Sequence, residues 1–360
     1  MCFKASLKKH TNQMMNKSTV LISLVIILLL GLMNCNLSNA GKAMVNADSD
    51  LLLTENIKHP DPLIVAFEKA VNQGEVEPFR RLFSPKMKGR NSAEKLRQRF
   101  GQLVAQVGSI KRLTLDQASD HTSSYISFHE KMISLRITFT MDENGLLDSM
   151  LIDSQTVNKD APTLARNKTS FILPFQEEWY VFWGGKKTSD NYHNAHTNMK
   201  GAYDFWVMGK NGKSHHKNAT RNEDFYAFGK PIISPVDAKV IFVYDQIADN
   251  QWPAMNPQAG YGNAVLLETV AKEYVLLAHL KQYSVTVKVG QEVRQGELLG
   301  LCGNSGNSTE PHLHFQLQNI PDFSAATGAW IYFDQIEVNG ILREGYLPKR
   351  GEKVRNRNTN

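Results

Sequence analysis

The chain has 360 residues, of which 42% are hydrophobic, and its formal net charge at pH 7 is +6. This length exceeds that of a typical domain, so two domains are expected. The positive excess lies mostly in residues 1–40, which hold four lysines and no acid, so the rest of the chain is nearly balanced in charge. A balanced charge without a basic recognition face argues against a nucleic-acid-binding protein.

The N-terminal segment has the pattern of an export signal. A basic stretch over residues 4–17 precedes an apolar run over residues 19–33, which is short for a membrane span. Small residues at Ser38 and Ala40 predict cleavage after Ala40. We therefore expect a signal peptide over residues 1–40, a polar linker over residues 41–57, and an exported protein that is periplasmic or extracellular.

Two alternatives for this segment stay open. One is a retained membrane anchor, in which case the uncleaved signal is the only contact with a membrane. The other is a lipid anchor at Cys35, for which Asn34 is bulkier than the residue expected before a lipidated cysteine. Cleavage after Ala40 leaves Cys302 as the only cysteine, which excludes an intrachain disulfide. We therefore expect the Cys302 side chain to act as a small buried hydrophobic group.

The first half of the mature chain reads as an α+β domain. Helical periodicity runs from Pro62 to Gly74, a second short helix is predicted over residues 78–83, and a third over residues 93–107. Alternating strand patterns follow over residues 125–152, with a hairpin turn at residues 142–145. Three helices followed by a curved antiparallel sheet resemble the cone-like fold of nuclear-transport-factor-two-like domains. This resemblance predicts a non-catalytic accessory domain over residues 58–157.

The second half reads as mainly antiparallel β. A polar stretch over residues 158–168 predicts a linker. Short strand patterns then occur between turn residues, over 238–244, 264–268, 274–280, 298–302 and 312–317. These patterns predict a β domain over residues 169–345, followed over residues 346–360 by a basic, solvated tail without regular structure.

The candidate functional residues lie mostly towards the end of this β domain. Side chains alternate along a strand, so His312 and His314 are expected to point to the same side and to form half of a metal site. His279 closes another predicted strand. The small residues of the loop 303–309 allow a close approach to a substrate backbone.

Five ordered motifs carry a resemblance to a known family. They are GYGN at 260–263, AHL at 278–280, VKVGQxVxxGxxxG at 287–300, GNSGNST at 303–309 and PHLHF at 311–315. Together they closely resemble the lysostaphin-type (LytM-type) zinc endopeptidases over about residues 170–320. The resemblance implies a metallopeptidase that cleaves peptidoglycan, with one zinc ion held by two His and one Asp. It also implies that His314 is a ligand and that His279 and His312 are catalytic.

The other two ligands come from earlier in the domain. Asp204, in the motif AYDF, matches the aspartate of the family. The family usually has His four residues before it, where this chain has Lys200, which cannot be a ligand while charged. The motifs WGG at 183–185 and NYH at 191–193 match one branch of the family, so we favour His193 as the first ligand and keep His196 as the alternative.

The predicted zinc site has a clear chemical logic. A catalytic zinc ion takes three protein ligands and leaves one position for water, whose pKa falls to roughly 7. His279 and His312 would then accept the proton of the attacking water and stabilise the developing oxyanion. Two residues depart from the family pattern: Glu310 replaces a common Gly, and Gln316 replaces a common Glu. Both are expected to reshape the groove.

Two other functions match parts of the sequence. An inactive wall-binding relative that regulates another hydrolase would typically lose a zinc residue, whereas this chain keeps all five. A lipoyl- or biotinyl-type carrier shares the VxxGxxxG turns, but no lysine stands at the matching hairpin tip. The sequence therefore favours an endopeptidase with one zinc ion per chain, acting on stem or bridge peptides of peptidoglycan.

Overall fold

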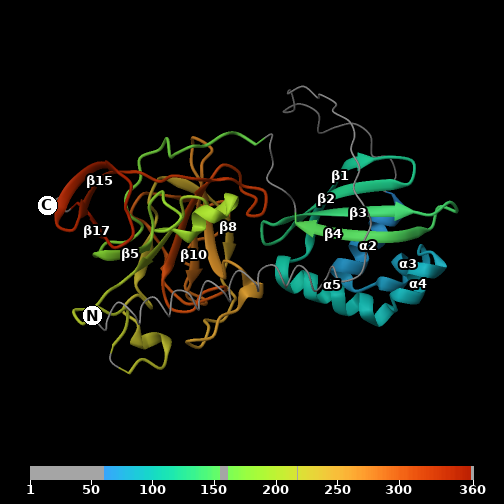
Figure 1. Cartoon of the computed structure of the whole chain (residues 1–360), viewed down its shortest axis with the longest axis horizontal. Helices are drawn as coiled ribbons and strands as arrows, with labels where there is room; N and C mark the ends of the chain where they lie inside the picture. Colours follow the sequence, from blue (N-terminus) through green and yellow to red (C-terminus); the bar gives the residue numbers. More distant parts are fainter. Residues whose placement is uncertain (1–60, 155–160, 217, 358–360) are drawn as a thin grey trace. The chain divides into compact units, whose positions relative to one another are not determined.

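The structure is a computed structural model that describes residues 61–154, 161–216 and 218–357. The predicted signal peptide and the linker over residues 41–57 lie outside these residues. All the described residues belong to one compact unit, residues 60–360 (Figure 1). In the described part, no helix combines the length and apolar character needed to cross a membrane.

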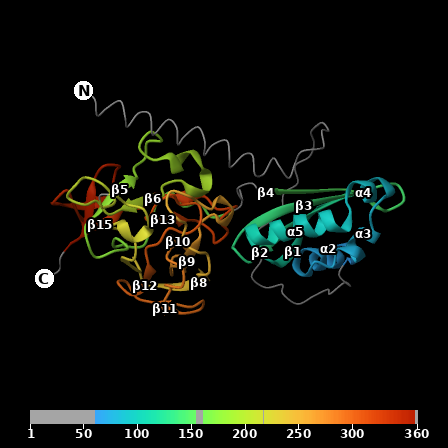
Figure 2. The same ribbon diagram turned by 90° about the horizontal axis from the view of Figure 1, so that it is seen from below.

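Residues 62–154 form helices and one antiparallel sheet, with the helices on one face of the sheet (Figures 1 and 2). The elements are α2 (Pro62–Gln73), α3 (Val76–Arg81), α4 (Pro85–Arg90), α5 (Ala93–Val107), β1 (Ile110–Ala118), β2 (Thr122–His129), β3 (Ser134–Met141) and β4 (Leu147–Ser154), and the strand order is β1-β2-β3-β4. Phenylalanines at edge-to-face distances fill the core between helices and sheet, among them Phe67, Phe79 and Phe139.

The helix predictions are right in position but incomplete in number. α5 has the predicted bounds, and α2 ends at Gly74, whose φ of 73° is easily adopted only by glycine. The expectation of three helices is wrong, because α4 is a fourth. It begins at Ser84, whose hydroxyl accepts a hydrogen bond from the Met87 N–H, and Pro85 occupies its first turn.

The second part is mainly antiparallel β, as predicted. Its strands are β5 (Trp179–Trp183), β6 (Tyr203–Trp206), β7 (Pro231–Ile233), β8 (Ala238–Tyr244), β9 (Asn263–Glu268), β10 (Tyr274–Leu280), β11 (Glu292–Val293), β12 (Leu298–Leu301), β13 (Leu313–Gln318), β14 (Gly328–Ala329), β15 (Phe333–Val338), β16 (Ile341–Tyr346) and β17 (Lys353–Asn356). The long sheet has the order β11-β8-β9-β10-β13-β6-β5-β17-β15-β16, β14 pairs with β13, and β12 pairs with β7.

Strand β13 separates the hydrophobic core from the polar side of the sheet. Leu313, Phe315 and Leu317 point into the core cluster, and the residues between them are polar but equally buried. This alternation brings His314 and Gln316 to the same face of the sheet. Cys302 is a fully buried free thiol in the same core, as the sequence predicts.

The prediction of an irregular tail over residues 346–360 is wrong. β17 lies inside the sheet between β5 and β15, where Val354 is fully buried. The side chain of Asn356 donates hydrogen bonds to two backbone carbonyls near the start of the β domain. The predicted linker 158–168 also ends within folded structure, since Arg166 forms a parallel bridge with Trp330.

Candidate functional site

Three separate elements bring the predicted metal ligands together. Asp204 on β6 and His314 on β13 are register partners across the sheet. His193 lies in the short 3₁₀ turn Tyr192–Ala195 between β5 and β6. All three side chains are buried, and their ligand atoms lie within 4.8 Å of one another. His196, the alternative to His193, is only half-buried and does not join this group.

The Asp204 carboxylate is the centre of this cluster. Its Oδ1 atom lies 3.0 Å from His314 Nδ1 and 3.6 Å from His193 Nε2. His193 Nε2 is buried without a hydrogen-bond partner. An unsatisfied buried nitrogen of this kind costs about 1–3 kcal/mol unless it has a partner, and a metal ion would accept its lone pair. Two imidazoles and one carboxylate are a donor set that suits zinc, so these residues fit the ion that the family resemblance implies.

Two carboxamides orient the imidazoles of His193 and His314. The Asn191 side chain donates to the Ala202 carbonyl, so its Oδ1 accepts from His193 Nδ1 at 2.9 Å. Gln316 Oε1 likewise accepts from His314 Nε2 at 3.2 Å. An amide oxygen can only accept, so the lone pair of neutral His193 is on Nε2. His314 turns Nδ1 towards Asp204 and makes a hydrogen bond of 3.0 Å with its Oδ1 atom.

Removing these carboxamides should weaken metal binding without removing a ligand. For Asn191→Ala and Gln316→Ala we expect zinc affinity to fall by about 10–100-fold, because each imidazole loses the acceptor that orients it. Competition with a chromogenic zinc chelator measures this. The matched control is Asn211→Ala, which alters an exposed asparagine in a surface turn. Unchanged zinc affinity in both variants would show that the carboxamides do not position the ligands.

His279 and His312 are oriented by backbone carbonyls. His312 Nδ1 donates to the Glu310 carbonyl and His279 Nδ1 donates to the Ser305 carbonyl, each at 2.8 Å. Both imidazoles therefore keep a free lone pair on Nε2 when neutral. His312 Nε2 lies 3.6 Å from Asp204 Oδ1, and the His279 and His312 rings lie 4.8 Å apart. The two predicted catalytic histidines thus flank the ligand cluster.

The backbone of His279 is strained. Its φ of 62° lies in the left-handed region, at a register shift between Ala278 and Leu280 on β10. The conformation is held on both sides, since the His279 N–H donates to the Tyr261 carbonyl and the Gly303 N–H donates to the His279 carbonyl. Bulges of this kind re-aim a side chain, and strain of this kind clusters at functional sites.

The small-residue loop 303–309 is held in place by the extended loop 245–259. Asn250 Nδ2 donates to the carbonyls of Gly306 and Ser308, at 2.8 and 2.9 Å. The Asn304 N–H donates to the Asp249 carboxylate. The Glu310 carboxylate accepts from the Ser214 hydroxyl at 2.9 Å. The two loops therefore form one hydrogen-bonded wall beside His312.

Burial controls the protonation of the cluster. It lowers the pKa of His193 to about 3, and it also lowers the pKa of His279 well below the ordinary value. Burial alone would raise the pKa of Asp204, but the imidazoles of His193 and His312 outweigh it and hold that pKa below its usual range. At neutral pH a buried neutral His193 thus faces an ionised Asp204, which is the protonation state that metal binding needs.

The metal-free protein should lose stability as the pH falls from 6.5, the ordinary pKa of histidine, towards 3. Over this window the unfolded chain binds a proton at His193 that the folded chain does not bind, so acid favours unfolding. Thermal melting in the presence of EDTA at several pH values measures this. His193→Asn should melt with a weaker dependence on pH, and identical pH dependence in the two proteins would contradict the assignment.

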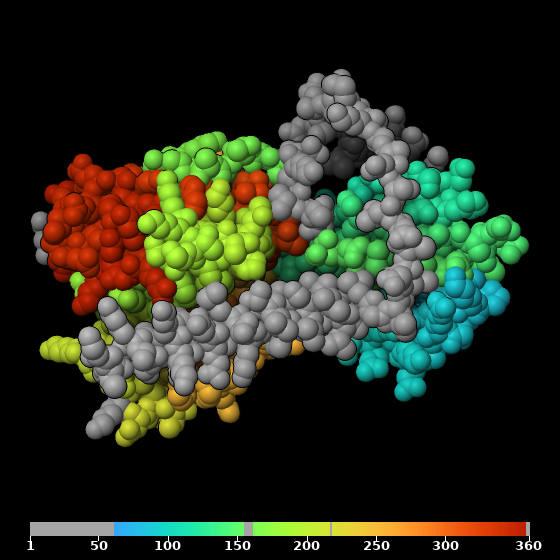
Figure 3. Space-filling model, in the orientation of Figure 1, coloured from blue at the N-terminus to red at the C-terminus, as the bar shows by residue number. Residues whose placement is uncertain are grey.

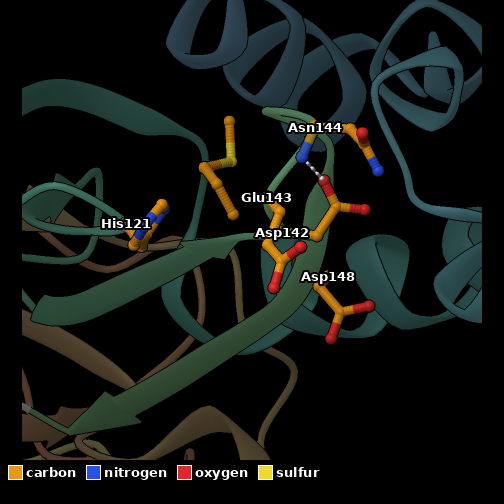
Figure 4. A pocket seen from close by; sticks show the side chains of 6 residues that line it. His121, Asp142, Glu143, Asn144 and Asp148 are labelled. Atoms are coloured by element: carbon orange, nitrogen blue, oxygen red, sulfur yellow. Dashed lines mark hydrogen bonds between the residues drawn. The ribbon is translucent and has the colours of Figure 1, made fainter.

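A shallow pocket of about 500 Å³ in the N-terminal part is unrelated to this site (Figure 4). It is lined by His121, Met141, Asp142, Glu143, Asn144 and Asp148. Asp142 accepts hydrogen bonds from two backbone N–H groups of its own turn, and Asp148 pairs with Lys86. Asp142 thus stabilises its own turn and Asp148 joins β4 to α4. Within the described part of the chain, only His193, Asp204 and His314 form a group of three that could hold a metal ion.

The structure brings the three predicted metal ligands together and sets His279 and His312 beside them, but the side chains that orient them were not predicted. Asn191 was noted only as part of a motif, Gln316 only as a departure from the family pattern, and Tyr192 was given no role. The carbonyls of Ser305 and Glu310 leave no mark in the sequence, because any residue supplies a carbonyl.

Comparisons with known proteins place the second half of the chain. Residues 221–326 match the model of peptidase family M23. This segment includes His279, His312 and His314 and begins after Asp204. The chain is similar to cell division protein DipM of Caulobacter vibrioides, with 36% identity over 93 residues, which are 26% of this chain and 13% of that protein.

Two further proteins are similar to parts of the chain. Glycyl-glycine endopeptidase ALE-1 of Staphylococcus capitis is 29% identical over 137 residues, which are 36% of this chain and 33% of that protein. The solved catalytic domain of the antimicrobial peptidase lysostaphin from Staphylococcus simulans aligns with a TM-score of 0.26 and 21% identity, over 42% of this chain and 88% of that domain. The matched segments thus span a third or less of the two curated relatives.

Proposed function

We propose that the protein is a zinc-dependent endopeptidase that hydrolyses peptide bonds in bacterial peptidoglycan outside the cytoplasm. The match of residues 221–326 to the model of peptidase family M23 supports this proposal. The substrate class follows from the lysostaphin-type motifs and from the peptidases among its relatives. The observation that carries the proposal is the buried group of His193, Asp204 and His314, with His279 and His312 beside it.

In this proposal His193 Nε2, Asp204 Oδ1 and His314 Nδ1 hold the zinc ion. When bound, zinc would act as a Lewis acid that polarises the scissile carbonyl and makes hydroxide available near neutral pH. Asn191 and Gln316 hold the two imidazoles so that His193 Nε2 and His314 Nδ1 face Asp204.

The remaining steps belong to His279 and His312. Each has its Nδ1–H tied to a carbonyl, so its Nε2 faces the reaction. One of the two Nε2 atoms accepts the single proton that the attacking water gives up and later donates that proton to the leaving amine. A protonated Nε2 also donates a hydrogen bond to the oxyanion that develops on the scissile carbonyl. The loop 303–309, fixed by Asn250, forms the wall against which the substrate backbone lies.

Metal content and product analysis together test this function. We expect one zinc ion per chain, release of crosslinked peptides from purified peptidoglycan, and loss of this release in EDTA with recovery on adding zinc. Mass analysis of the fragments identifies the bond that is cut. A protein that binds zinc but releases nothing would be the inactive wall-binding relative, and a protein that binds none would contradict the metal site.

We also propose a division of labour along the chain. Residues 62–154 have their own core and form an accessory domain of the nuclear-transport-factor-two-like kind. The peptidase domain extends from about Ala165 to Arg357, because β17 completes its sheet. Purified residues 161–360 should therefore retain the zinc site, whereas a chain ending at residue 345 should not fold stably.

A further inference from the structure

A continuous strip of aromatic rings runs from the ligand His193 to the guanidinium of Arg350. The ring of Tyr192 lies 4.1 Å from the His193 ring, and the Trp183 ring lies 5.3 Å from the Tyr192 ring. The Arg350 guanidinium lies 4.2 Å from the centre of the Trp183 ring. We call Tyr192, Trp183 and Arg350 the Arg350 ledge.

The ledge is also connected to the strand that carries Asp204. Phe182 stacks on Trp206 with ring centroids 3.7 Å apart, and it meets Trp183 edge to face. A register shift between β5 and β6 at Phe182 lets neighbouring residues of β5 contribute to one cluster. The aromatic strip is therefore held by two strands of the sheet rather than by a loop.

The ledge is accessible. Tyr192 is 42% exposed, although it adjoins the fully buried His193, and Trp183 and Arg350 are half-buried. The space-filling view shows the segment around residue 190 and the C-terminal strands adjoining on one face of the molecule (Figure 3). A large exposed aromatic side chain beside the buried group of His193, Asp204 and His314 is suited to contacting a bound substrate.

The charge of Arg350 is not neutralised within the described part of the chain, where no carboxylate lies within 4.0 Å of its guanidinium. Its one hydrogen bond there is a long one of 3.5 Å to the Ser189 carbonyl. A guanidinium has five N–H donors, so most remain available. The ammonium groups of Lys186 and Lys200 lie over the Trp330 ring, and they likewise form no ion pair with a described residue. The Arg350 guanidinium can thus bind an anion.

We propose that the Arg350 ledge is a substrate subsite that binds a free carboxylate of a cell-wall peptide, with the Tyr192 and Trp183 rings supporting the peptide between that carboxylate and the scissile bond. This inference rests on the proposed function. The planar guanidinium matches a carboxylate through two parallel hydrogen bonds. The short steps from His193 to Arg350 place the carboxylate within about four residues of extended chain from the scissile bond.

The experiment compares the wild-type protein and three variants on two substrates. The substrates are soluble crosslinked muropeptides, untreated or with their carboxylates converted to amides by carbodiimide and ammonia. We expect the wild-type protein to prefer the free carboxylates by about tenfold in KM, with kcat within about twofold. Arg350→Gln should lose this preference while keeping its zinc content, and Arg350→Lys should keep part of it because the charge remains.

Arg343→Gln is the matched control, since Arg343 is an exposed arginine on β16 outside the ledge, and it should behave like the wild type. A purely structural role of Arg350 predicts that Arg350→Gln slows cleavage of both substrates equally, and that result would overturn the proposal. So would a wild-type protein that does not distinguish the two substrates.

A binding measurement separates failure of the ledge from failure of the proposed function. Co-sedimentation with untreated and amidated peptidoglycan needs no turnover. Suppose that the wild type cleaves neither substrate but binds untreated peptidoglycan better than amidated peptidoglycan, and that Arg350→Gln shows no such preference. The ledge proposal then stands and the proposed endopeptidase activity is wrong. If binding is equal in all cases, the ledge proposal is wrong whatever the activity.

Discussion

Replacing Asp204 with alanine is expected to remove zinc from the protein and to lower peptidoglycan hydrolysis by at least about a thousandfold. Asp204 supplies the only carboxylate of the cluster, and its Oδ1 atom lies within 3.6 Å of a nitrogen of His193, His312 and His314. Its loss leaves two neutral imidazoles, which bind zinc far more weakly than the full set. Zinc per chain, measured by mass spectrometry after dialysis, and release of wall peptides give the two readouts.

Two further variants sharpen this prediction. Asp204→Asn keeps the shape of the side chain but not its charge, so it should also lose most of the zinc. Asp120→Ala alters an exposed aspartate in the N-terminal part and should leave both readouts unchanged. Stoichiometric zinc in Asp204→Ala would mean that the ion binds elsewhere.

Replacing His312 with alanine is expected to leave zinc bound and to lower kcat by about 10²–10⁴-fold. In the proposed mechanism His312 moves a proton through Nε2 and does not hold the metal. The matched variant is His314→Ala on the same face, which should lose the zinc itself. Distance alone does not separate a ligand from a proton carrier here, because His312 Nε2 and the predicted ligand atom His193 Nε2 both lie 3.6 Å from Asp204 Oδ1.

The metal content therefore decides the assignment. Zinc lost from His312→Ala but kept in His314→Ala would exchange the two roles. The dependence of kcat on pH gives an independent check, since removing a proton-transfer group should flatten one limb of the profile while leaving substrate binding intact.

Much of the fold could be predicted from the sequence, because it depends on local patterns. Helix α5 and strands β8 and β10 have the predicted bounds, since their hydrophobic spacing and flanking turn residues act over a few positions. Alternation along a strand likewise brings His314 to the polar face of β13. The choice of His193 over His196 came from a motif, and the buried cluster contains His193.

The errors and omissions concern contacts between distant segments. β17 has a basic sequence typical of a tail, but pairing with β5 and β15 buries Val354 and satisfies its backbone. Asn191 and Gln316 act only because the fold places each opposite the outer nitrogen of a ligand histidine. The left-handed backbone of His279 is imposed by neighbours from two other segments.

The sequence by itself thus predicted the residues of the candidate site: two histidines and an aspartate that suit a metal ion, which the structure brings together, and two more histidines whose part in proton transfer stays a prediction. Only the tertiary structure decided which nitrogen each imidazole presents and what surrounds the cluster, including the contact between Arg350 and Trp183. The physical reason is that residue type is local information, whereas tautomer, burial and stacking depend on side chains that are far apart in the chain.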